Sequence, residues 1–196
     1  MVANIGGEIK CVVVGDGGVG KTSMLLRYID GRFLEEYIPT CFDSYAVSLD
    51  HGDRYYHLCL MDTAGQETYD RLRTLSYFNT DVFVVCFSVA SQDSFTNVRT
   101  RWIPELKEFK PGTRFILVGT QADLRDDAQY PGECVSLSQA KKLARKVGAE
   151  AYVECSSLTG DGLKNVFQGA LTTAVCPKKK KKFWRSFKQL FKKNEK

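Results

Sequence analysis

The sequence predicts an α/β protein with a doubly wound, six-stranded, mostly parallel sheet and one antiparallel edge strand. The first observation is a series of short apolar runs, which are typical of buried strands. These runs lie at residues 11–14, 45–49, 56–61, 82–88, 115–119 and 151–154. The second observation is that longer stretches with helical periodicity separate most of these runs. The helical stretches lie near residues 21–30, 67–77, 91–109, 136–147 and 162–175.

The second and third apolar runs are joined too closely for a helical crossover. Only residues 50–55 lie between them, and the stretch Asp50, His51, Gly52 and Asp53 is typical of a hairpin turn. We therefore expect this pair of strands to be antiparallel and the other pairs to be parallel. In doubly wound sheets, ligands bind at the carboxyl ends of the strands.

Length and composition indicate one globular domain, which we place at residues 1–177, and a basic tail at residues 178–196. The chain has 196 residues, of which 43% are hydrophobic, enough for a substantial core. Its seven cysteines are scattered without a C-x-x-C pair, which argues against a zinc site or a disulfide framework and favours a reducing, cytoplasmic setting. No apolar run approaches the roughly 20 residues that span a bilayer, and the start lacks a signal-peptide core.

A glycine-rich motif directly follows the first predicted strand. Residues 15–22 read Gly-Asp-Gly-Gly-Val-Gly-Lys-Thr, the phosphate-loop pattern G-x-x-x-x-G-K-[ST]. Its glycines let backbone N–H groups surround phosphates, Lys21 supplies a cation, and the Thr22 hydroxyl can bind Mg2+. An ordinary glycine-rich turn is the alternative, but a strand before the motif and a helix after it favour phosphate binding. The residues expected to bind a nucleotide here are Asp16, Gly17, Gly18, Val19, Gly20, Lys21, Thr22 and Ser23.

A second motif, residues 62–67, follows the third predicted strand. The Asp62 carboxylate at the strand end can hold Mg2+ through a water molecule. The backbone N–H of Gly65 can donate to a γ-phosphate, and the side chain of Gln66 can orient an attacking water. These residue types in this order indicate nucleotide hydrolysis.

Two further motifs favour guanine over adenine. Asp123 follows the fifth predicted strand, together with Gln121, and its carboxylate can accept the N1–H and 2-amino donors of guanine, a pair that adenine lacks. After the last strand, a backbone N–H within Ser156, Ser157 and Leu158 can donate to guanine O6. Each motif alone is a weak signal, but four in this order predict a GTPase and not an ATPase or a kinase.

Two other stretches resemble the switch regions of small GTPases of the Rho family. Residues 37–45 read Tyr-Ile-Pro-Thr-Cys-Phe-Asp-Ser-Tyr, and residues 69–77 read Tyr-Asp-Arg-Leu-Arg-Thr-Leu-Ser-Tyr. The resemblance covers residues 8–177. Asp43 is similar to the residue of Rac-like and Cdc-type members, where the other main Rho branch has Glu.

The resemblance implies a guanine-nucleotide switch that binds GTP and GDP with Mg2+. It implies that Phe33 lies edge-on over the guanine, that Tyr37 closes over the phosphates, and that Thr40 contacts both Mg2+ and the γ-phosphate. The implied metal-binding residues are Thr22, Thr40 and, through water, Asp62. The implied catalytic residues are Gln66, Lys21 and Thr40.

The same resemblance implies slow GTP hydrolysis and regulation by partners. No residue is an obvious arginine finger, so the protein should need a GTPase-activating protein as well as exchange factors. Effectors of cytoskeletal and membrane signalling should read Phe42, Asp43 and Tyr45, and we expect a monomer that binds no nucleic acid. The alternative function is a GTP-bound scaffold that exchanges nucleotide rapidly and barely hydrolyses it.

Three positions and one segment depart from the family pattern. Gly18 replaces the usual Ala, and Gln121 replaces a common Lys. The side chain of Gln121 should cover the purine less well than lysine and so speed nucleotide exchange. Met61 stands where Rac-like members have an aromatic residue, so the choice of exchange factor stays open. Residues 125–135 are shorter than the helical insert of Rho proteins and predict a turn or short loop.

A basic tail stands where the resemblance implies a C-terminal prenylation box, so we expect no prenyl anchor. From Lys178 to Lys196 there are ten Lys or Arg and one Glu, a net charge of +9 against +5 for the whole chain, which leaves −4 on the remainder. The apolar positions Phe183, Trp184, Phe187, Leu190 and Phe191 form one helical face. This pattern predicts a basic amphipathic helix on an anionic membrane surface, with a nuclear-targeting or calmodulin-type segment, or a solvated tail, as alternatives. Cys176 beside it is either a structural helix-end residue or an acylation site.

Overall fold

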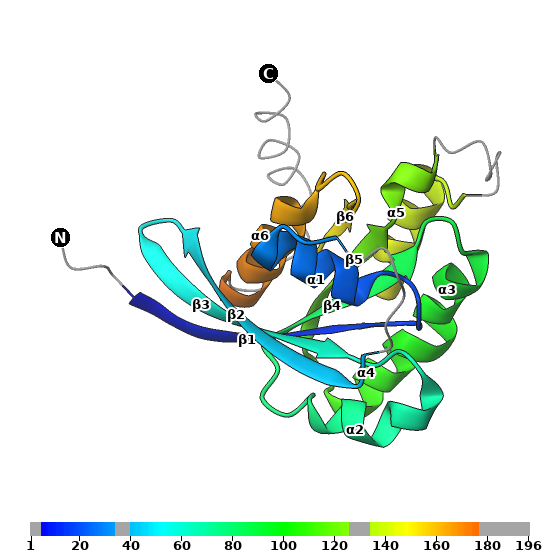
Figure 1. Ribbon diagram of the computed structural model, residues 1–196. Helices are drawn as coiled ribbons and strands as arrows, with labels where there is room; N and C mark the ends of the chain where they lie inside the picture. Colours follow the sequence, from blue (N-terminus) through cyan, green and yellow to red (C-terminus); the bar gives the residue numbers. More distant parts are fainter. Residues whose placement is uncertain (1–4, 34–39, 126–133, 177–196) are drawn as a thin grey trace.

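One six-stranded sheet runs through the computed structural model, which describes residues 5–33, 40–125 and 134–176 (Figure 1). Its strands are β1 (Ile5–Gly15), β2 (Phe42–His51), β3 (Arg54–Thr63), β4 (Val82–Ser88), β5 (Arg114–Thr120) and β6 (Tyr152–Glu154). Their spatial order is β2-β3-β1-β4-β5-β6. The β2–β3 pair is antiparallel and every other neighbouring pair is parallel. The predicted fold class is confirmed, with β2 as the antiparallel edge strand.

Helices cover both faces of this sheet. They are α1 (Lys21–Asp30), α2 (Asp70–Leu75), α3 (Gln92–Asn97), α4 (Ile103–Phe109), α5 (Leu137–Val147) and α6 (Leu163–Val175). Side chains alternate along β4, so that Val84 packs with α1 and α6 while its neighbour Phe83 packs with Trp102 and α5 on the other face. A strand buried on both faces explains why β4 is apolar throughout.

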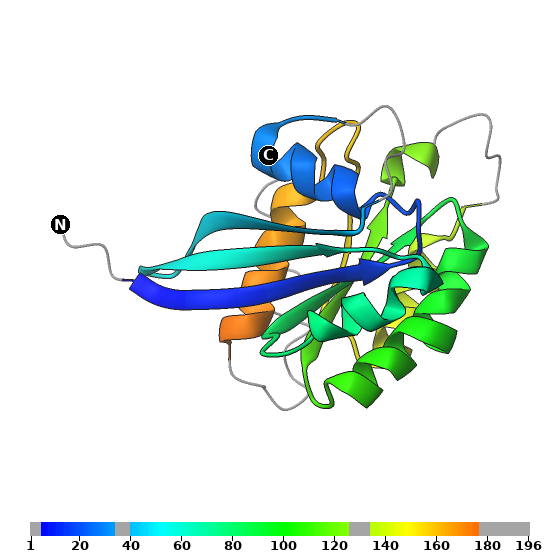
Figure 2. The same ribbon diagram turned by 60° about the horizontal axis from the view of Figure 1, so that its bottom comes forward.

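Several elements differ from the sequence-based expectation. β1 begins at Ile5, six residues earlier than predicted, because residues 5–10 pair with β3. Gly6 and Gly7 interrupt the apolar pattern, so the sequence did not indicate this extension. The ring of Tyr56 occupies the position that a Cβ on Gly6 would take. In Figures 1 and 2 the paired strands β1, β2 and β3 project beyond the helices toward the N-terminus.

The stretch predicted as one helix at residues 91–109 is divided. It consists of α3, a π-helical segment (Val98–Trp102) and α4. Likewise, residues 67–77 contain a 3₁₀ turn (Glu67–Tyr69) and then α2, which ends at Leu75. Another 3₁₀ turn, Ala122–Arg125, follows β5 and had no counterpart in the prediction.

Several predicted features lie outside the described residues: Tyr37, most of the expected loop at residues 125–135, and the basic tail. All seven cysteines are described, and all are free thiols. In the described part of the chain no helix combines the length and apolar character needed to cross a membrane.

The sheet brings the sequence motifs to one edge. The phosphate loop follows β1, the Asp62 motif closes β3, the Asp123 motif follows β5, and residues 156–158 follow β6. Because β1, β3, β5 and β6 run in the same direction, these four carboxyl ends meet at the same end of the molecule.

Candidate functional site

A cavity of about 410 Å3 lies at the carboxyl edge of the sheet. Segments that are far apart in the sequence line it: the phosphate loop, the end of β3 with the residues after it, and the loops after β5 and β6. Of the predicted site residues, the lining includes Gly17, Gly18, Gly20, Lys21, Thr22, Ser23, Phe33, Thr40, Gly65, Gln66, Gln121, Asp123, Ser157 and Leu158. This size suits a small-molecule ligand.

Lys21 is the cation of the cavity. Its residue is 6% exposed, and its Nζ donates to the carbonyl oxygens of Gly15 and Asp16, each at 2.8 Å. Burial lowers the pKa of Lys21, and the nearby carboxylate of Asp62 opposes this shift. The ammonium group is thus held by carbonyl dipoles at the start of the phosphate loop, and it lies beside the N-terminus of α1, where an anionic ligand is favoured.

Three oxygen-bearing side chains meet beside Lys21. The Thr22 hydroxyl lies 2.6 Å from both the Thr40 hydroxyl and Asp62 Oδ2. Asp62 Oδ1 is buried and, among the described residues, is the one buried side-chain polar atom without a hydrogen-bond partner. Burial raises the pKa of Asp62, whereas the hydrogen bond from Thr22 and the charge of Lys21 oppose this shift.

This oxygen cluster fits Mg2+. Hydroxyl and carboxylate oxygens are the ligands that a small hard cation prefers, and an unpartnered buried carboxylate oxygen is available to a metal or to its water. The described residues contain no group of three or more His, Cys, Asp or Glu side chains that could hold a metal. Thr22, Thr40 and Asp62 are the residues of this cluster that would hold Mg2+.

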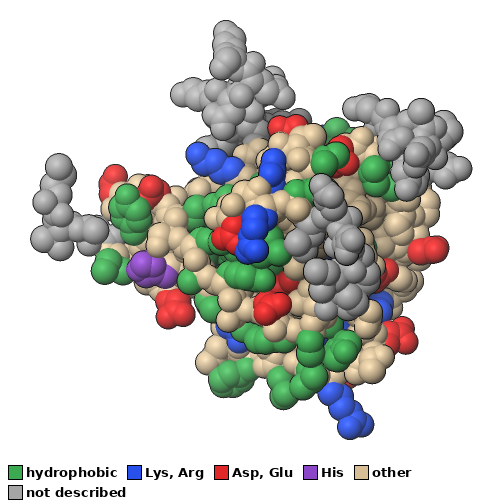
Figure 3. All heavy atoms as spheres, in the orientation of Figure 1, with side chains coloured by type: hydrophobic (Ala, Val, Ile, Leu, Met, Phe, Trp, Pro, Cys, Tyr) green, Lys and Arg blue, Asp and Glu red, His purple; other side chains and the backbone are tan. Residues whose placement is uncertain are grey.

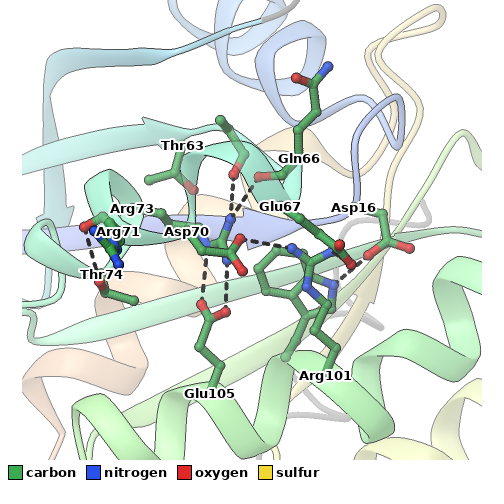
Figure 4. A network of polar contacts seen from close by, with 12 residues as sticks. Asp16, Thr63, Gln66, Glu67, Asp70, Arg71, Arg73, Thr74, Arg101 and Glu105 are labelled. Carbon is green, nitrogen blue, oxygen red and sulfur yellow. Dashed lines mark hydrogen bonds and ion pairs between the residues drawn. The ribbon is translucent and has the colours of Figure 1, made fainter.

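The segment after β3 lies against the phosphate loop. A Cβ on Gly65 would come within 2.3 Å of the backbone carbon of Asp16 and 2.4 Å of Gly17 N. Only glycine permits this approach. The neighbouring Gln66 side chain is exposed and lines the cavity, and in Figure 4 it points away from the polar network behind it.

The loops after β5 and β6 are tied to each other. Ala122 N donates to the carbonyl oxygen of Cys155 at 3.1 Å, and Arg125 forms two hydrogen bonds of 2.7 Å with the Glu154 carboxylate. These contacts fix the 3₁₀ turn that carries Asp123 beside residues 157–158. Gln121 has a left-handed backbone with φ of 56°, which is uncommon for a residue other than glycine.

A few predicted site residues do not line the cavity. The Asp16 side chain turns away from it, since its carboxylate accepts hydrogen bonds from Trp102 Nε1 and Asn97 Nδ2, both at 2.7 Å. Val19 is buried, and its carbonyl oxygen accepts from the Thr120 hydroxyl, which joins the phosphate loop to β5. Asp62 lies behind Thr22, and Ser156 is 2% exposed.

Sequence reasoning missed three lining residues: Thr63, Ala64 and Leu124. Each lies inside or next to a motif that was identified, so adjacency to Asp62, Gly65 and Asp123 was the available signal. Their small or apolar side chains carry no chemistry that would have singled them out.

The fold and the site together define a P-loop nucleotide-binding protein of the α/β class. Residues 10–176 match the family model described as the Ras family. The chain belongs to the Ras family of small GTPases. Members of this family bind GTP and GDP, usually with Mg2+, and act as GTP-binding switches that hydrolyse GTP to GDP.

Proposed function

We propose that this protein is a Rho-like, Rac-related switch that hydrolyses GTP slowly and signals to effectors from a membrane surface. The observation that supports hydrolysis most directly is the position of residues 65 and 66. Gly65 packs against the phosphate loop, and Gln66 lines the same cavity as Lys21. A γ-phosphate bound by Lys21 would therefore have an N–H donor and a water-orienting amide within the same pocket.

The proposed reaction is an in-line attack by water on the γ-phosphorus of GTP. Gln66 orients the water, whose oxygen forms a bond to phosphorus as the bond from phosphorus to the β–γ bridging oxygen breaks. One proton of the water passes to an oxygen of the released phosphate and the other stays on the attacking oxygen, while the bridging oxygen keeps the electron pair of the broken bond and leaves with GDP. Lys21 stabilises negative charge on the β and γ oxygens, and Thr40 donates its N–H to the γ-phosphate. When bound at Thr22, Thr40 and Asp62, Mg2+ supplies further positive charge to the same oxygens.

The conformational change of the switch follows from contacts that only GTP offers. Thr40 and Gly65 gain a partner when the γ-phosphate is present and lose it after hydrolysis. Thr40 leads directly into β2, where Phe42 and Asp43 are exposed and Tyr45 is partly exposed on the free edge of the sheet. We propose that effectors read this edge and that exchange factors and activating proteins act on the neighbouring loops.

Exposed hydrophobic side chains also lie on α2 and directly after it. Leu72 and Leu75 of α2 and Phe78 after it are 52%, 73% and 73% exposed. Hydrophobic side chains gather over α2 at the bottom of Figure 3. Contiguous exposed apolar surface marks contact sites for partners, which supports the proposed regulation.

A rapidly exchanging, GTP-bound scaffold is the second candidate function. It is favoured by Gln121, whose left-handed backbone lies in the loop that would hold the base, at a cost of the order of 1 kcal/mol. The two candidates differ in which process is faster. A switch that is timed by hydrolysis releases GDP more slowly than it hydrolyses GTP, so that GDP accumulates, whereas the scaffold releases GDP faster and stays loaded with GTP.

We expect wild-type protein with Mg2+ to release GDP more slowly than it hydrolyses GTP, and Gln121→Lys to slow the release further. The longer, charged lysine stem would cover the purine more completely. Release of a fluorescent GDP into excess unlabelled GDP measures this rate, with Thr96→Lys on the exposed surface of α3 as a control for added charge. Release that outpaces hydrolysis in the wild type would favour the scaffold, and equal release from both proteins would remove Gln121 as its determinant.

We also propose that residues 178–196, which lie outside the described residues, attach the protein to the cytoplasmic face of a membrane. Cations near an anionic surface contribute about 1 kcal/mol each, and Trp and Phe suit the headgroup boundary. A nuclear fraction is compatible with the same basic run. Cys176, at the end of α6, would be the site of any acylation in support of this attachment.

Trp184→Ala combined with Phe187→Ala should weaken binding to anionic liposomes without changing the net charge. The reason is that the apolar face would insert into the headgroup boundary, a contribution that adds to charge attraction. Co-sedimentation with anionic and with neutral liposomes measures it. Undiminished binding of the double variant would leave charge attraction alone as the cause, and no binding of the wild type would refute the attachment.

A further inference from the structure

Arg73 of α2 is a buried arginine whose five N–H groups all face an acceptor. Its Nε and Nη2 donate to the two carboxylate oxygens of Glu105, at 3.1 and 2.7 Å, and Nη2 also donates to Asp70 Oδ1 at 2.7 Å. Its Nη1 donates to the carbonyl oxygens of Ala64 at 3.0 Å and Gln66 at 3.5 Å. The side chain is 0% exposed. Every N–H group of the guanidinium is thus hydrogen-bonded, and Figure 4 shows the cluster.

Glu105 and Trp102 hold the guanidinium of Arg73 in place. Glu105 belongs to α4, has a side chain that is only 12% exposed, and accepts a hydrogen bond from the hydroxyl of Tyr77 as well. The guanidinium carbon of Arg73 lies 4.7 Å from the ring centroid of the buried Trp102. Burial alone would lower the pKa of Arg73, but Glu105 and Asp70 raise it overall, so the group stays charged. The position of Arg73 is therefore set by the π-helical segment and α4.

The same support reaches the phosphate loop. Trp102 Nε1 donates to Asp16 Oδ1 at 2.7 Å, and Asn97 Nδ2 donates to Asp16 Oδ2 at 2.7 Å. Both carboxylate oxygens of this loop residue are thereby occupied. Trp102 therefore contacts both the phosphate loop, through Asp16, and the guanidinium of Arg73.

The two carbonyl groups that Arg73 holds flank Gly65. The Ala64 carbonyl and the Gly65 N–H belong to one planar peptide unit, so fixing the carbonyl also fixes the direction of the N–H. The second carbonyl is that of Gln66 itself, which also accepts from Tyr69 N at 3.2 Å. Because the backbone is held on both sides of Gly65, the position from which the Gln66 side chain enters the cavity is fixed.

We propose that Arg73 is a positioning residue for GTP hydrolysis, which fixes the peptide units around Gly65 and thereby places the Gln66 side chain. This inference rests on the proposed function, since it needs hydrolysis that depends on Gln66. Arg73 is fully buried and does not line the cavity, so it acts through residues 64–66. Lysine cannot replace it, because a single ammonium group cannot reach acceptors spread over Glu105, Ala64 and Gln66.

Arg73→Lys should slow single-turnover GTP hydrolysis about tenfold or more, with the affinity for GTP changed by less than about threefold. Small misplacements of catalytic groups have effects of this size even when they arise away from the reacting atoms. In the Gln66→Leu background, Arg73→Lys should slow hydrolysis no further, because its effect passes through Gln66. Arg71→Lys, the same substitution on an exposed residue of α2, is the matched control and should leave the rate unchanged.

The outcomes separate this inference from the function on which it rests. If Gln66→Leu hydrolyses GTP at the same rate as the wild type, the proposed function fails and the inference fails with it. If Gln66→Leu removes hydrolysis but Arg73→Lys hydrolyses at the wild-type rate, or slows the Gln66→Leu protein further, Arg73 has no positioning role. A lower melting temperature with an unchanged rate per bound GTP would identify a structural role only.

A milder variant covers the case in which Arg73→Lys does not fold. Glu105→Gln keeps the size of the side chain and one carbonyl acceptor but removes the charge that anchors Arg73. It should slow hydrolysis in the wild-type background and have no effect in the Gln66→Leu background. Unchanged hydrolysis by a folded Glu105→Gln protein would overturn the inference.

Discussion

Replacing Asp123 with Ala should remove the preference of the protein for GTP over ATP. The carboxylate would accept two hydrogen bonds from guanine, and hydrogen bonds to a charged group contribute about 1.5–3 kcal/mol each. Their loss should weaken GTP binding by about 10²–10⁴-fold, whereas ATP, which lacks this donor pair, should lose little. Asp123 lines the cavity from a 3₁₀ turn that Arg125 and Glu154 hold in place, so the substitution should leave that turn intact.

Competition of GTP and of ATP against a fluorescent GDP, with Mg2+ present, measures both affinities. Asp53→Ala, an exposed aspartate in the β2–β3 turn, is the matched control and should bind like the wild type. If the wild type bound GTP and ATP equally, or if Asp123→Ala kept the wild-type ratio, Asp123 would not be the residue that selects guanine.

The parts of the fold and site that the sequence predicted are those encoded by neighbouring residues. The phosphate loop is a contiguous pattern, and the alternation of apolar runs with helical stretches leaves few arrangements other than a doubly wound sheet. The hairpin between β2 and β3 follows from the few residues that separate the two runs. Because the carboxyl ends of parallel strands meet at one edge, the convergence of the motifs of Asp62 and Asp123 followed from the same reasoning.

The parts that the sequence did not predict depend on contacts between distant residues. The hydrogen bond from Trp102 to Asp16 joins residues 86 positions apart, and no local periodicity encodes it. Arg73 is of a residue type that normally lies on the surface, and only the positions of Glu105 and Ala64 reveal why it is buried. The π-helical segment and the left-handed Gln121 are likewise set by packing and not by a local signal.

Gln66→Leu should abolish most of the GTP hydrolysis by this protein and leave GTP binding nearly unchanged. Leucine has a similar volume but cannot hydrogen-bond a water molecule, so the attacking water loses its orientation, at a cost of about tenfold or more in rate. Gln66 is exposed, so stability should change by no more than about 0.5 kcal/mol. The substitution therefore separates the chemical step from binding and from folding.

The expected rate without a partner is low. Ras, a member of the same family, hydrolyses GTP at roughly 3–5 × 10⁻⁴ per second, and an arginine finger from an activating protein raises this about 10⁵-fold. No arginine lines the described cavity. We therefore expect unassisted turnover well below the roughly 10⁻² per second of GTPases that carry such an arginine in their own chain.

Single-turnover hydrolysis of GTP by purified wild-type and Gln66→Leu protein, both loaded with GTP and Mg2+, tests the central claim most directly. Slow hydrolysis by the wild type that is largely lost in Gln66→Leu is the expected result, and it would establish a switch timed by hydrolysis with Gln66 placing the water. Equal and negligible hydrolysis by both proteins would contradict this account and favour the exchange-driven scaffold.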